Sequence, residues 1–134
     1  MNRLRRPHAE NGQTMVEFAL VAPLLLVLVI AIVQLGVAYN HYLRLTDAVR
    51  AGARKASVSR LLVESPKGKS ASDAVYDAAD LDPSKLVVTV TASPDWTKPG
   101  NEVTVQAKYD YSINIMGIVV KSGQMTATTT ERLE

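Results

Sequence analysis

A single carboxylate at the start of a long apolar run is the side chain in this sequence best placed to do chemistry. Residues 1–12 are polar, carry three arginines and end at Gly12. Glu17 is the fifth residue counted from Gln13, and the apolar run begins directly after it. A charge at the centre of a bilayer costs about 2.5–3.5 kcal/mol on insertion scales. A cationic partner for Glu17 would therefore remove much of the cost of placing it at a membrane.

Cleavage of the chain between Gly12 and Gln13 would create such a cation. The new amino group of one subunit would then pair with Glu17 of another and fix the axial register of two helices. The alternative is that Glu17 lies in the headgroup zone and contacts water. The residues alone leave both interpretations open.

The apolar run predicts a membrane-spanning helix. Residues 18–33 contain no polar side chain, and after Gln34 the run continues to Tyr39. About 22 residues give a helix of roughly 33 Å, which spans a bilayer core of ~30 Å. We therefore assign residues 1–12 as an unstructured leader that ends at a turn, and residues 13–39 as the transmembrane helix.

Three features of this segment suggest how the helix is held. Pro23 is expected to bend it, because proline frees a backbone carbonyl of the preceding turn. Tyr39 and Tyr42 lie where an interfacial aromatic belt is expected. Gly36 is, with Pro23, a candidate position for helix packing.

Residues 40–63 predict an amphipathic extension of the same helix into water. Ala48, Gly52 and Ala56 are spaced four apart, so they lie on one face of the helix. Such small residues let another backbone approach closely. The partner is either the chain's own sheet or another subunit, and both remain open at this point.

Residues 64–134 predict a small α/β part with antiparallel strands, so the fold class is α+β. A short helix with Ser70 or Ser72 as its N-cap is expected first. Alternating β-branched residues then indicate strands, which together form a sheet of three or four strands on the long helix. The expected elements are a helix at 72–79, strands at 86–92, 102–111 and 124–132, and a strand or a turn of helix at 113–120.

Composition excludes several function classes. The sequence has no cysteine, so disulfides and thiolate chemistry are absent. The net charge of +2 belongs to residues 1–12, which leaves the rest of the chain neutral. Because phosphate binding needs a concentrated basic face, we expect no direct binding of nucleic acid.

No catalytic constellation is visible either, so we expect no enzyme, no metal and no cofactor. The two histidines, His8 and His41, are far apart in the sequence. Trp96 lies between two prolines, which is typical of a turn residue that packs on a sheet. An acidic cluster lacks the spacing of a calcium loop and is better explained as a solvated helix face. Its members are Asp73, Asp77, Asp80 and Asp82.

The leader, the glycine and the glutamate together resemble a type IV prepilin. More narrowly, residues 12–26 (GQTMVEFALVAPLLL), 34–36 (QLG) and 48–54 (AVRAGAR) resemble the TadE-like minor pilins of tight-adherence (Flp) pilus systems, as does the ending TERLE at 130–134. The resemblance implies a type IV pilin-like fold, with the long helix packed on a small sheet. It also implies cleavage by a prepilin peptidase after Gly12.

The same resemblance implies partners and a place in the cell. Residues 18–39 would be both membrane anchor and filament core, and Glu17 would be the subunit-pairing residue. The implied partners are the inner membrane, the prepilin peptidase, other minor pilins and the pilus assembly platform. Arginines flank both ends of the span, so the positive-inside rule gives no decision. A short basic tail before a first apolar segment still favours a cytoplasmic N-terminus, with the C-terminal part outside.

Three other interpretations compete. Ordinary signal peptidase would cut after Gly36-Val37-Ala38 and release a secreted protein. An uncleaved leader would instead indicate a single-pass subunit of another envelope complex. A membrane-tethered enzyme is the third, and no residues support it.

Overall fold

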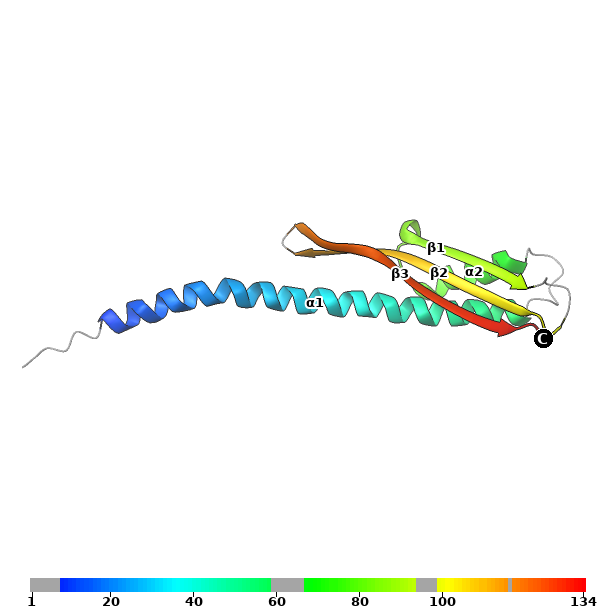
Figure 1. The fold of residues 1–134 in the computed structure, drawn as a ribbon, viewed down its shortest axis with the longest axis horizontal. Coiled ribbons are helices and arrows are strands. Elements are labelled where there is room, and N and C mark those ends of the chain that lie inside the picture. Colours follow the sequence, from blue (N-terminus) through cyan, green and yellow to red (C-terminus); the bar gives the residue numbers. More distant parts are fainter. Residues whose placement is uncertain (1–7, 59–66, 94–98, 116) are drawn as a thin grey trace, which may run out of the picture.

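One long helix dominates the molecule. The structure, a computed structural model, describes residues 8–58, 67–93, 99–115 and 117–134. Helix α1 runs from His8 to Val58, and its C-terminal half packs against a small domain while its N-terminal half projects alone (Figure 1). A three-stranded antiparallel sheet and a second helix complete the domain. The predicted α+β class, with a long N-terminal helix beside a small sheet, is confirmed.

Helix α1 is continuous across the boundaries that the sequence suggested at residues 12–13 and 39–40. It passes through Pro23. Figure 1 shows a gentle change of direction in the blue part of the ribbon. The helix begins at His8 and passes through Gly12, so the unstructured state expected of residues 8–12 and the turn expected at Gly12 are both wrong. A glycine inside a helix costs only about 1 kcal/mol, which the neighbouring helix formers offset. The extension predicted over residues 40–63 is helical to Val58, and the remainder lies outside the described residues.

Helix α2 spans Lys67–Ala79 and begins earlier than expected. Ser70 and Ser72 therefore lie inside the helix, and the prediction that one of them is the N-cap is wrong. The Ser72 hydroxyl instead donates to the carbonyl of Lys69 at 2.8 Å, a bond that serine commonly makes within helices. A short 3₁₀ helix, η2 (Pro83–Lys85), follows, and the Asp82 side chain accepts from the backbone N–H of Ser84 to cap it.

The sheet has the strand order β1-β2-β3, with all neighbours antiparallel. The region that was either a strand or a turn of helix, 113–120, forms the end of a hairpin, with Gly117 at a positive φ of 88°. Trp96 lies outside the described residues. The strands are β1 (Leu86–Ser93), β2 (Glu102–Ile115) and β3 (Ile118–Arg132).

The core lies between α1, α2 and one face of the sheet. Alternate residues of β2, from Val103 to Tyr109, point inward, as the two-residue period of a strand requires. Alanines supply much of the remaining core, so α1, α2 and β2 approach closely. The buried hydrophobic residues from the two helices are Leu45, Ala48, Val49, Ala53, Ala56, Ala71, Val75 and Ala79.

Gly52 marks the closest approach. A Cβ atom on Gly52 would overlap Val75 Cγ2 and would lie 3.0 Å from the carbonyl oxygen of Ala71. Ala48 and Ala56, one turn away on either side, are fully buried. The small-residue face of α1 therefore packs on the chain's own α2 and β2, one of the two partners that the sequence left open.

Gly52→Ala should destabilise the domain by about 1–3 kcal/mol, because overpacking forces shifts in a close-packed core. Urea unfolding of the detergent-solubilised protein, followed by circular dichroism, measures the change. Gly36→Ala is the matched control, because nothing lies within 4 Å of a Cβ at that position. Adding Val75→Ala to Gly52→Ala should recover part of the loss. Equal stability of the two single variants would contradict this packing.

Candidate functional site

The residues around the predicted cleavage point lie on one continuous stretch of α1. Nothing lies within 4 Å of a Cβ built on Gly12, so this part of the helix is open on all sides. Gln13 Nε2 donates to Glu17 Oε1 at 3.1 Å, one helical turn further on, and both residues are exposed. The carboxylate of Glu17 therefore reaches back toward Gln13, in the direction in which helical side chains lean.

Glu17 makes no ion pair with any residue that the structure describes. The sheet and α2 lie at the other end of the molecule, alongside the C-terminal half of α1 (Figure 1). Met15 and Phe18 beside it are 77% and 70% exposed. A carboxylate in this position has a surface around it that another molecule can cover.

The apolar run after Glu17 has the length and composition to cross a membrane. It is the one such helix among the described residues, and none of its most apolar stretch is buried inside the molecule. Leu20, for example, is 74% exposed. A soluble protein would cover such a helix with its own core, so the exposure supports a single-pass membrane anchor.

Gln34 joins the apolar run to the sheet. Its Nε2 donates to the carbonyl oxygen of Asn114 at 2.9 Å, across 80 residues of sequence. An amide that enters an apolar environment without a hydrogen bond is costly, so this contact satisfies part of the one polar side chain in the run. The only sequence signal for the contact was an isolated glutamine among aliphatic residues, which indicates a partner without naming it.

Aromatic residues surround the point where the sheet meets α1. Tyr39, Tyr42 and Tyr111 line an open groove of about 440 Å³ between α1 and the β2–β3 hairpin. His41 packs edge-on against Tyr109, with 5.7 Å between the ring centroids. The predicted belt tyrosines of α1 are thus joined at the same level by a tyrosine of the sheet.

Charged residues beyond the belt are engaged within the domain. Arg44 Nη1 lies 2.8 Å from Asp80 Oδ2 and 3.2 Å from the Asp80 carbonyl oxygen. Asp80 has a positive φ of 48°, which aspartate tolerates better than most residues. Arg50 pairs with Asp47 at 3.3 Å. Two of the four basic residues on the C-terminal flank of the span therefore have acidic partners.

The remaining acidic residues do not form a metal site in the described part of the chain, where no group of three potential ligands gathers. The hydroxyl and the backbone N–H of Ser84 both donate to Asp82, and these bonds lower the pKa of its carboxyl group. Asp82 is therefore explained by the cap of η2.

The structure separates the predicted packing positions into two groups. Ala48, Gly52 and Ala56 lie in the core of the domain. Pro23 and Gly36 are exposed, and nothing lies within 4 Å of a Cβ at Gly36. Any role of the second group in packing must involve lipid or another molecule.

Replacing Gln34 by leucine should loosen the hairpin from α1. A typical intramolecular hydrogen bond contributes about 0.5–1.5 kcal/mol, so amide exchange near Asn114 should accelerate by about fivefold. Hydrogen exchange of the micelle-bound protein measures this rate. Val33→Leu, one residue away on an exposed position, is the control. Unchanged exchange in Gln34→Leu would show that the contact contributes nothing to the position of the hairpin.

Comparison with known proteins agrees with the geometry over the first part of the chain. A family model described as TadE-like protein matches residues 12–54. No curated protein and no solved structure matches. The matched segment includes Gly12, Glu17, Gln34 and Gly52, and it covers the apolar run together with the small-residue face. Over this segment, about a third of the chain, the sequence is similar to TadE-like proteins.

Proposed function

We propose that the chain is a minor pilin, or pseudopilin, that takes part in assembly of a tight-adherence pilus. In this proposal a prepilin peptidase cuts between Gly12 and Gln13, and Glu17 pairs with the new amino group of a neighbouring subunit. The observation that carries the proposal is the exposed carboxylate of Glu17, five residues into the proposed mature chain. It is the charged group nearest the start of the apolar run.

The direction of the Glu17 side chain suits this pairing. Its contact with Gln13 Nε2 shows that the carboxylate reaches the level of the first residue of the proposed mature chain. A neighbour's terminus at the same level would meet it. The pair would form at the edge of a low-dielectric region, where opposite charges attract more strongly than in water. Pairing would therefore offset the cost of drawing Glu17 into an apolar assembly.

The peptide bond to be cut lies inside α1, so the peptidase must first unwind that turn. Gly12 makes this step easier, because glycine lowers helix stability by about 1 kcal/mol relative to alanine. The absence of any group within 4 Å of its Cβ position also leaves room for a protease. Gly36 shares these two properties, so the choice of Gly12 rests on its place between the basic leader and the apolar run.

The charges on either side of the span support a topology without deciding it. We place the N-terminus in the cytoplasm and the domain on the outer side of the inner membrane. Arg44 and Arg50 are paired with Asp80 and Asp47, which reduces the basic character of the C-terminal flank. Residues 1–12 contain three arginines and one acidic residue, Glu10. The proposed partners are the prepilin peptidase, other minor pilins and the assembly platform, and the role is structural rather than enzymatic.

The hydrogen bond of Gln34 argues against the secreted alternative. Cleavage after Ala38 would remove Gln34 and leave the exposed end of the hairpin without its helix. A permanently anchored subunit of another envelope complex remains the second candidate. It differs from the pilin in one measurable property, the retention of residues 1–12.

Intact-mass spectrometry of the protein from its host membranes tests the cleavage. We expect a mature form that begins at Gln13, because the helix is open and weakest at Gly12. Gly12→Leu should keep the full-length mass, since a large side chain stabilises the turn and fills the space beside the bond. A full-length wild-type protein in assembled pili would contradict the proposed processing.

Glu17→Gln tests the pairing separately. We expect normal cleavage but a loss of at least about tenfold in piliation, since each 1.4 kcal/mol of lost interaction is a factor of ten. Electron microscopy and co-purification with other pilins measure the loss. Glu102→Gln, an exposed carboxylate at the start of β2, is the control and should assemble normally. Full piliation by Glu17→Gln would remove the basis of the pairing.

A further inference from the structure

We propose that the end of the β2–β3 hairpin rests in the outer leaflet of the membrane that α1 crosses. This inference extends the anchoring part of the proposed function and rests on it. The hairpin tip is defined here as Ile113, Asn114, Ile118, Val119 and Val120. Its occupant is lipid, at the boundary between headgroups and acyl chains.

The hairpin tip is apolar and uncovered. Ile118, Val119 and Val120 are consecutive and are 72%, 59% and 61% exposed. Soluble domains rarely leave such a contiguous group in water, and exposed apolar patches mark surfaces that contact a partner or a membrane. Consecutive side chains of a strand point to opposite faces, so these three aliphatic side chains cannot all enter one core.

The backbone of the hairpin tip also lacks support within the domain. Pairing between β1 and β2 ends at Tyr109, so the hairpin beyond that residue is a ribbon of two strands. An isolated two-stranded ribbon is only marginally stable in water. It needs a surface on which to lie, and α1 supplies one side of that surface.

The bond from Gln34 to Asn114 fixes the level of the hairpin tip along α1. Figure 1 shows the hairpin lying beside α1 and extending beyond β1 toward the N-terminal half of the helix. Gln34 belongs to the apolar run itself. The hairpin tip is therefore beside the membrane segment and not beside the water-exposed extension.

The rise of α1 per residue gives the depth of the hairpin tip in the bilayer. Gln34 is the sixteenth residue after Phe18, which is roughly 24 Å of helix at ~1.5 Å per residue. If the bilayer core of ~30 Å begins at Phe18, Gln34 lies about 6 Å inside its far face. If the bilayer thins to match the uninterrupted apolar run, Gln34 lies at that face. Both limits bring the hairpin tip into contact with acyl chains.

The unpaired edges of the hairpin limit how deeply the hairpin tip can enter the bilayer. Unpaired backbone N–H and C=O groups are not tolerated deep in hydrocarbon, because no water reaches them. The hairpin tip therefore belongs at the boundary of the core and not at its centre. The aliphatic side chains enter lipid while the backbone remains within reach of interfacial water.

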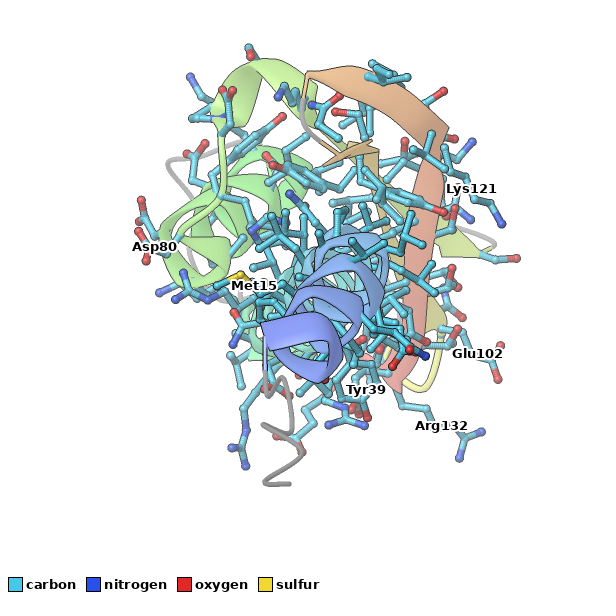
Figure 2. The ribbon with its side chains drawn as sticks, turned by 90° about the vertical axis from the view of Figure 1, so that its left-hand side faces the viewer. Met15, Tyr39, Asp80, Glu102, Lys121 and Arg132 are labelled. Carbon is cyan, nitrogen blue, oxygen red and sulfur yellow. The ribbon has the colours of Figure 1, made fainter. Side chains whose placement is uncertain are left out.

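The residues just above the hairpin tip have the chemistry of an interface. Tyr39, Tyr42 and Tyr111 line the groove beside Lys121, and tyrosine is enriched at headgroup level. Lys121 extends to the outside of the molecule, away from α1 (Figure 2), where a lysine reaches lipid phosphate. A second protein copy would not require a lysine and three tyrosines at one membrane level, so these residues favour lipid.

Depth-dependent quenching tests the inference. The sequence has no cysteine, so a single introduced cysteine carries the only fluorescent label. The full chain with Val119→Cys, labelled with an environment-sensitive dye, is reconstituted in phosphatidylcholine vesicles whose acyl chains carry bromine near the headgroup or near the chain end. We expect a blue-shifted emission that is lost with the shallow bromines and is lost less with the deep ones.

Two further labels complete the experiment. Val33→Cys, exposed on the apolar run, reports whether α1 is in the bilayer, and Thr126→Cys, exposed further along β3, should not be quenched. Quenching at Val33 without quenching at Val119 overturns the inference and leaves the anchor intact. Protection of Val119 from an aqueous quencher without bromine quenching shows that protein covers the hairpin tip, which also overturns it. Absence of quenching at Val33 removes the anchor and the inference together.

Discussion

The unbroken backbone of α1 is the constraint on which the other features depend. One helix of 51 residues is at once the candidate membrane segment and the wall of the domain core. Because a helix rises a fixed ~1.5 Å per residue, the position of Glu17 at one end determines the level of every later side chain. Gln34 then lies at the far side of a bilayer, and Gly52 lies well into the aqueous domain. A shift of the helix along the membrane normal would move the sheet by the same distance.

The domain compensates for its small size through close packing. Most of its buried helical residues are alanine, valine or glycine, and each of these side chains buries little apolar surface. They do allow α2 and β2 to approach the backbone of α1 at Gly52, and close-packed contacts gain from many short-range attractions. The sheet alone has three strands and an exposed hairpin end. Its attachment to α1, through Gly52 at one end and Gln34 at the other, is therefore what positions it.

The sequence predicted the helices and strands well where the hydrophobic periodicity is strong. It predicted them poorly where a contact between residues far apart in the sequence determines the local structure. The alternation in β2 predicted its inward face, and the length of the apolar run predicted the helix. The start of α2 was missed because Lys67 and Lys69 carry no capping signal. The helical state of Gly12 was missed because an Asn-Gly pair favours a turn only when its neighbours do not continue a helix. The contact of Gln34 with Asn114 joins positions 80 residues apart, and no local pattern encodes it.

Each end of the membrane segment carries a group that is unfavourable in one of the two environments, hydrocarbon or water. Glu17 is a charge that must not enter hydrocarbon alone, and the hairpin tip is an apolar surface that must not remain in water. In a bilayer both are satisfied at once, with the carboxylate at one headgroup layer and the hairpin tip at the other. If the chain enters a filament, as proposed, the lipid is lost from both ends. The carboxylate would then need an amine from a neighbouring subunit, and the hairpin tip would need an apolar protein surface. Neighbouring subunits that supply both contacts would take the place of the bilayer at both levels of α1. A subunit that supplies only the amine would leave Ile118, Val119 and Val120 in water, and this cost favours neighbours whose own helices cover the hairpin tip.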